Sequence, residues 1–308
     1  MMLDLLFFAA PGNYFPTAVA GLFGLLIGSF LNVVIHRLPR MMQREADDYL
    51  ALDSQNREEA QKLGSPITSI TYQSEVTLPH TDQYNLTLPR STCPVCQHRI
   101  TALENIPVVS YLALGGKCSA CKNPISIRYP IVELLTGALS AFLIWHFGSG
   151  WLGLSSLVFA FLLIAMTFID ADTQFLPDSL TYPLLWGGLL VNLFGMIVPL
   201  REAVIGAVAG YLALWLVNAI FKAIRKVDGM GYGDFKLLAA LGAWLGWKML
   251  PLIVLLSALV GSVVGIALIV MAKHDRKNAI PFGPYLAGAG MIALLFGKPL
   301  LQAYLAAN

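Results

Sequence analysis

Long apolar segments dominate this chain of 308 residues. A helix that crosses the roughly 30 Å hydrocarbon core of a bilayer needs about 20 mostly apolar residues. Segments of about that length occur at residues 17–36, 131–147, 152–169, 180–198, 203–224, 235–249, 251–272 and 284–301. Charged residues make up only 12% of the chain, about half the share in soluble domains. The sequence therefore predicts an all-α polytopic membrane protein with about eight transmembrane helices.

The basic residues predict the orientation of these helices. If the N-terminus lies outside, the inner loops hold 17 of the 20 basic residues, and the outer loops keep only Arg201, Lys248 and Lys298. Inner loops of membrane proteins are enriched in Lys and Arg, which favours this orientation. The first residues carry Asp4 instead of a basic stretch, so the first apolar segment is read as a retained span. The net charge of +2 is too small to indicate nucleic-acid binding.

One region does not have the composition of a membrane span. Residues 39–129 are polar, charged and interrupted by proline. We interpret them as a cytoplasmic domain between a first transmembrane helix at 1–38 and a multi-span membrane core at 130–308. Within this domain, residues 41–64 have the pattern of an amphipathic helix, and residues 68–88 alternate weakly, as short strands do.

Four cysteines lie in the polar region, and they are the only ones in the chain. They form two C-x-x-C pairs, Cys93–Cys96 and Cys118–Cys121, with 21 residues between the pairs. Disulfides are disfavoured on the reducing inner side of a membrane. Two such pairs supply the four thiolates of a structural Zn²⁺ site with no open position for chemistry. Unrelated cysteines or a redox pair are the alternatives. The pattern predicts a small zinc-ribbon-like loop domain.

Two acidic clusters fall on the same membrane face in the predicted orientation. The first holds Asp170, Asp172 and Asp178 at the inner end of the third span, and the second holds Asp234 at the start of the sixth. Two carboxyl groups brought close share a proton, so that one acts as general base on a water and the other as general acid. Helix capping by Asp178 and Asp234 is the alternative. Spacing alone does not choose among the three acids of the first cluster.

The segment around Asp234 resembles a motif of a known protein family. Gly-Tyr-Gly-Asp-Phe-Lys at 231–236 is similar to the G-x-G-D motif of intramembrane aspartyl proteases. Together with Asp170-x₇-Asp178 and the paired C-x-x-C, it resembles the bifunctional type IV prepilin leader peptidases of Gram-negative bacteria. The segments 28–39, 128–133 and 281–284 also resemble signatures of that family. The resemblance extends over about residues 28–284, most of the chain.

The resemblance implies two activities and assigns the acids. In that family the first catalytic acid opens a D-x₆-P-[DN] pattern, which matches Asp170, and the second matches Asp234. The closing position is often Asn in relatives, which argues against Asp178. The enzyme would cut the leader from prepilins and type II secretion pseudopilins at the cytoplasmic face. It would then methylate the new N-terminal residue with S-adenosylmethionine. The implied location is the bacterial inner membrane, with the N-terminus in the periplasm.

Only the resemblance assigns candidate residues for the methyl-donor site. No G-x-G-x-x-G opens a strand–turn–helix unit, so no soluble-type cofactor fold is predicted. By resemblance, the candidate residues are Gly28, Asn32, Arg37 and Glu133. Close helix packing is an equally good explanation for Gly28, as is a positive-inside anchor for Arg37.

Two rival functions belong to other classes. A transporter or channel would use intramembrane acids as ion sites, but it predicts acids near the midplane and repeated halves. A non-enzymatic assembly factor of a secretion machine would use the zinc loop for docking.

Overall fold

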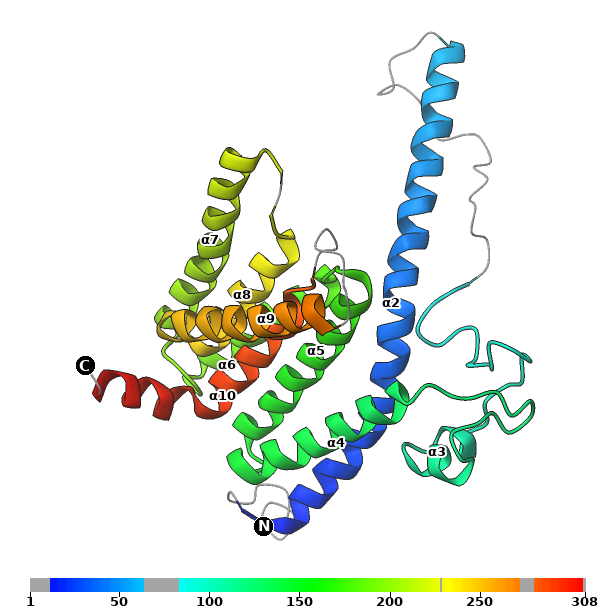
Figure 1. The fold of residues 1–308 in the computed structure, drawn as a ribbon, viewed down its shortest axis with the longest axis horizontal. Helices are drawn as coiled ribbons and strands as arrows, with labels where there is room; N and C mark the ends of the chain where they lie inside the picture. Colours follow the sequence, from blue (N-terminus) through cyan, green and yellow to red (C-terminus); the bar gives the residue numbers. More distant parts are fainter. Residues whose placement is uncertain (1–11, 64–82, 228, 272–279, 307–308) are drawn as a thin grey trace.

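The computed structural model describes residues 12–63, 83–227, 229–271 and 280–306 (Figure 1). Within those ranges the chain is helical and contains no β-strand, which confirms the predicted all-α fold. The principal helices are α2 (Tyr14–Leu63), α4 (Arg128–Phe147), α5 (Trp151–Thr173), α6 (Asp178–Leu193), α7 (Leu200–Arg225), α8 (Tyr232–Leu245), α9 (Leu250–Met271) and α10 (Gly283–Ala306). Shorter elements are α3 (Val109–Ala113), η2 (Leu103–Asn105) and η3 (Trp247–Met249).

Not all of the predicted spans are equally long. By length and composition, five helices in the described ranges can cross a membrane: α2, α4, α5, α7 and the η3–α9 segment. Gly283–Gly297 of α10 is a shorter apolar helix. Helices α6 and α8 have 16 and 14 residues, or about 24 and 21 Å, less than the bilayer core. The predicted span at 235–249 is broken, because Gly246 turns the chain at a φ of 78° that suits glycine.

Helix α2 differs from the expectation of a first span that ends near residue 38. It is one helix of 50 residues that continues through Pro39 and extends well beyond the other helices (Figure 1). The expected helix at 41–64 is therefore a continuation of the first span, and the predicted domain boundary falls inside a helix. Residues 64–82, which include most of the expected strands at 68–88, lie outside the described residues, and 83–88 form no strand.

Helix α8 is at the centre of the membrane core. Every residue of α8 from 237 to 245 is buried, and its leucines join a hydrophobic cluster with side chains from α5, α6, α7, α9 and α10. A Cβ atom added to Gly206 of α7 would lie 2.3 Å from the Gly242 carbonyl oxygen, and one on Gly242 would lie 2.2 Å from that of Gly206. The small residues therefore let the backbones of α7 and α8 touch.

Hydrogen bonds fasten the C-terminal end of α8 to α6. The Trp244 indole N–H donates to the Leu184 carbonyl at 2.7 Å. The side-chain amide of Asn192, which is 1% exposed, donates to the carbonyls of Ala243 and Trp244 at 2.8 and 2.9 Å. The carbonyls of Ala243 and Trp244 lie in the last turn of α8, where carbonyl groups have no partner within their own helix. The bonds hold α8 in place, and its first turn carries Asp234.

Candidate functional site

The two predicted catalytic acids lie together although they are far apart in the sequence. Asp170 is in the last turn of α5 and Asp234 in the first turn of α8. The two residues are 4% and 8% exposed, and their carboxyl groups interact electrostatically. A Cβ atom on Gly233 would lie 2.8 Å from Cβ of Leu176, so the start of α8 packs closely on the segment that follows α5. The glycine before Asp234 allows this approach.

Helix α10 supplies a third component that the sequence did not indicate. The Gly283 backbone N–H donates a hydrogen bond of 3.0 Å to Oδ2 of Asp170. Gly283 is the first residue of α10, where unpaired N–H groups and the helix dipole favour a negative charge. A Cβ atom at this position would lie only 2.7 Å from the same carboxylate oxygen. The segment 281–284 matches a family signature by resemblance, but no pattern in it predicts this contact.

The other acids of the first cluster have cationic partners. Asp178 pairs with Lys236, whose Nζ lies 2.6 Å from Oδ1. Asp172 pairs with Arg128 at 2.7 Å, and the same guanidinium donates to the Phe168 carbonyl at 3.1 Å. Among the residues that the structure describes, Asp170 and Asp234 have no ion pair with a base. The absence of a basic partner within the described ranges distinguishes Asp170 and Asp234 from Asp172 and Asp178. The spacing of the acids in the sequence did not make this distinction.

The two cysteine pairs form knuckles with the same backbone geometry. In the first, the N–H of Gln97 donates to the Cys93 carbonyl; in the second, the N–H of Lys122 donates to that of Cys118. Gln97 and Lys122, each directly after a second cysteine, have φ values of 59° and 62°. An antiparallel bridge closes each knuckle, between Thr92 and Arg99 and between Lys117 and Pro124. The loop domain thus contains two knuckles of the same geometry.

The four thiols have the spacing of a tetrahedral metal site. All four Sγ atoms lie within 4.8 Å of one another, with Cys93 to Cys121 at 3.8 Å and Cys96 to Cys118 at 3.9 Å. Four sulfurs bound to one Zn²⁺ at about 2.3 Å stand about 3.8 Å apart. Backbone N–H groups of Cys96 and Val95 lower the pKa of the Cys93 thiol to about 6, which favours the thiolate that a metal needs. The donor set therefore fits zinc.

Glu104 connects the two knuckles. Its carboxylate accepts hydrogen bonds from the Ser119 hydroxyl beside Cys118, from the backbone and side chain of Thr101, and from His98. The Ser119 hydroxyl, followed by these Thr101 and His98 contacts, lowers the pKa of Glu104 to about 2. Glu104 is therefore a charged acceptor at neutral pH that stabilises the arrangement of the loop.

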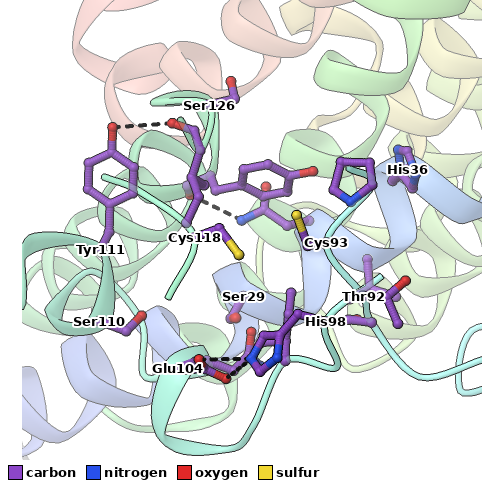
Figure 2. A pocket seen from close by; sticks show the side chains of 18 of the residues that line it. Ser29, His36, Thr92, Cys93, His98, Glu104, Ser110, Tyr111, Cys118 and Ser126 are labelled. Carbon is purple, nitrogen blue, oxygen red and sulfur yellow. Dashed lines mark hydrogen bonds and ion pairs between the residues drawn. The ribbon is translucent and has the colours of Figure 1, made fainter. Parts of the chain in front are cut away.

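A cavity of about 580 Å³ lies between the loop domain, α2 and the start of α4. Figure 2 shows side chains from both sides of it: Ser29 and His36 of α2, and Cys93, His98, Glu104 and Cys118 of the loop domain. The volume is typical of small-molecule sites. The residues that line it do not include Asp170 or Asp234.

Three of the four candidate methyl-donor residues line this cavity, and one does not. Asn32, Arg37 and Glu133 contribute to its wall. Arg37 donates to the carbonyls of Asn85 and Pro89 at 2.9 and 2.6 Å, so its guanidinium fastens the loop to α2. Gly28 is not in the lining; a Cβ atom there would lie 2.7 Å from Cα of Glu133. Gly28 therefore serves close packing of α2 on α4, the alternative raised from the sequence.

These features define a multi-span helical membrane protein with a buried carboxyl pair and a separate four-thiol centre. Two family models match the chain: the bacterial peptidase A24 N-terminal domain at residues 22–147, and the type IV leader peptidase family at residues 157–266. The chain belongs to the type IV leader peptidase family.

Relatives of high similarity extend over nearly the whole chain. A protein of Aeromonas salmonicida named prepilin leader peptidase/N-methyltransferase is 52% identical over 295 residues, which cover 96% of this chain and 95% of that protein. A protein of Pseudomonas aeruginosa with the same name is 50% identical over 288 residues, 92% of this chain and 91% of its own. No solved structure shows a significant match to the chain.

Proposed function

We propose that this chain is an aspartyl endopeptidase that cleaves the leader peptides of type IV prepilins and type II secretion pseudopilins at the cytoplasmic membrane face. It then methylates the new N-terminal residue with S-adenosylmethionine. The names of the relatives support both activities. The observation that carries the peptidase proposal is the buried pair of Asp170 and Asp234, which interact with each other and have no basic partner among the described residues.

The proposed mechanism uses the two carboxyl groups in complementary roles. One takes a proton from a water whose oxygen attacks the scissile carbonyl carbon, and the other donates a proton to the carbonyl oxygen. Asp170 accepts the Gly283 N–H, and this donor stabilises a negative charge on it, so we assign Asp170 as the base. Asp234 is then the acid. When the tetrahedral intermediate collapses, the C–N bond breaks and a proton passes to the leaving nitrogen.

Cys93, Cys96, Cys118 and Cys121 would hold a structural Zn²⁺, and their sulfur spacing supports this. The protein would lie in the bacterial inner membrane with its N-terminus in the periplasm. The apolar helix of a prepilin would then lie in the bilayer beside the spans, with its leader near the acid pair.

Detergent-purified protein incubated with a prepilin, with and without S-adenosylmethionine, tests both activities by mass spectrometry. We expect the leader to be lost in both reactions, and the mass of one methyl group to appear only with the donor. An intact precursor would favour the transporter or assembly-factor alternative. Cleavage without methylation would remove the second activity and leave the first.

Replacing Gly283 by alanine is expected to slow cleavage about 10- to 100-fold. The added Cβ atom would lie 2.7 Å from Oδ2 of Asp170, so the carboxyl group must move, and small misplacements of catalytic groups have effects of this size. Gly288→Ala is a matched control on the same helix, because a Cβ atom there meets nothing within 4 Å. The measurement is the rate of leader cleavage by the two purified variants. Equal rates would show that the contact with Gly283 does not position Asp170.

A further inference from the structure

Glu133 is a second buried carboxylate that the peptidase mechanism does not use. It lies in the first half of α4, is 8% exposed, and lines the cavity beneath the loop domain. Its Oε2 accepts the Val108 backbone N–H at 2.7 Å, and its carboxylate also accepts the Ser29 hydroxyl. No cationic side chain in the described part of the chain acts on it.

A buried carboxylate without a cationic partner is costly, and a cationic ligand would offset that cost. A carboxylate has about four acceptor positions; the Val108 N–H and the Ser29 hydroxyl occupy two, and the others remain for a ligand in the cavity. Tyr111 and Tyr129 also line the cavity, and aromatic faces attract cations; the ring of Tyr84 in the same wall already carries the Arg44 guanidinium, 4.3 Å from its centroid. The cavity therefore suits a positively charged group of a small molecule or chain terminus.

The cavity and the acid pair lie at the same end of the helix bundle. His36 in the cavity wall interacts electrostatically with Arg128 and Asp172. Asp172 lies two residues after Asp170 in the last turn of α5 and is ion-paired with Arg128. An amine released at Asp170 and Asp234 thus arises at the end of α5 whose Asp172 interacts with His36 in the cavity wall.

We propose that Glu133 binds the new N-terminal ammonium group of the cleaved substrate in this cavity and acts as the base for its methylation. The inference rests on the methyltransferase activity proposed above. It divides the two reactions between separate sites, with peptide hydrolysis at Asp170 and Asp234 and methyl transfer at Glu133.

The proposed step is balanced in atoms and charge. The Glu133 carboxylate takes one proton from the R–NH₃⁺ terminus, which leaves a neutral amine. The nitrogen lone pair attacks the methyl carbon of the sulfonium donor; the N–C bond forms, the S–CH₃ bond breaks, and its electron pair stays on sulfur. The products are R–NH₂⁺–CH₃ and the neutral thioether. Glu133 then releases its proton to solvent.

Glu133→Gln tests the inference because the amide oxygen can still accept from Val108 and Ser29 but cannot take a proton. Leader cleavage by the full-length variant is expected to stay at the wild-type rate, which also reports correct folding. Methyl transfer is expected to fall at least about 10-fold at pH 7, where most of an α-amino group with a pKa of about 7.7–8.0 is protonated. The defect should shrink by pH 9, because the amine then deprotonates without a base.

Controls separate this role from its alternatives. Glu202→Gln removes a carboxylate of α7 that pairs with Lys248, and it should change neither reaction. Calorimetric titration with S-adenosylhomocysteine should give equal affinities for wild type and Glu133→Gln, since Glu133 contacts the amine and not the donor.

Several results would contradict the inference. Equal methylation by wild type and Glu133→Gln would contradict the role of Glu133 and leave the proposed methyltransferase activity standing. A methylation defect that does not change with pH, or a loss of donor binding, would contradict the role of Glu133 as well. If the wild type itself does not methylate a cleaved substrate, the proposed methyltransferase activity fails first.

Discussion

Replacing either Asp170 or Asp234 by asparagine is expected to abolish leader-peptide cleavage while the protein still inserts in the membrane. The amide has nearly the same shape, and in the Asp170 variant its oxygen can still accept the Gly283 N–H, but it cannot exchange a proton with water or substrate. Loss of one general acid or base lowers rates by about 10²- to 10⁴-fold. Both residues are buried, so bulk water is a poor substitute for the missing proton donor or acceptor. The measurement is the rate of leader loss from a purified prepilin.

Asp172→Asn is the matched control for this prediction. Asp172 belongs to the same acidic cluster, but its carboxylate is 42% exposed and pairs with Arg128. Surface ion pairs contribute little to stability, so this variant should retain most of its cleavage activity. Normal processing by Asp170→Asn or Asp234→Asn, at matched expression, would end the aspartyl protease assignment.

The second large effect is expected from loss of the four-thiol centre. Cys93→Ser removes one ligand from a site whose binding free energy is also the folding free energy of a small domain. Among the described residues of the loop domain, only the knuckles, α3 and η2 are regular, and the elements α3 and η2 have no buried residues. We therefore expect loss of bound zinc and rapid proteolysis between residues 83 and 127. Methyl transfer should fall more than cleavage, because the loop forms one wall of the cavity.

Val95→Ser is a suitable control, since Val95 lies inside the first knuckle and is 63% exposed but supplies no thiolate. Metal analysis and limited proteolysis of the purified variants provide the readout. A wild-type protein without zinc, in which all four thiols react freely, would contradict the metal proposal.

The features best predicted from the sequence are those fixed by local chemistry. Each apolar segment folds as a helix because lipid forces backbone groups to pair within the segment. The C-x-x-C spacing predicted the four-thiol cluster, since each knuckle brings two sulfurs to one side of a turn. The proximity of Asp170 and Asp234 was expected from the orientation of the spans and from a family resemblance, and the structure brings them together.

The features that were missed depend on contacts between distant segments. The first span was expected to end near residue 38, where the sequence becomes polar and charged, but α2 continues through Pro39. Arg37 could be read as an anchor or a ligand, and only the fold shows its bonds to Asn85 and Pro89. The Gly283 contact joins residues 113 positions apart, and no local pattern indicates such a pairing. The roles of Asp178 and Asn192 likewise follow from partners on α8.

The short length of α8 has a consequence for the supply of solvent. Hydrolysis consumes one water for every bond cut, and a hydrocarbon environment contains almost none. A helix of 14 residues leaves about 9 Å of a 30 Å bilayer core without helix. Irregular backbone at that depth is tolerated only against protein or an aqueous channel. Because Asp234 lies in the first turn of this short helix, we expect water to reach the acid from the end of α8 at Tyr232 and not through the lipid along the sides of the helix.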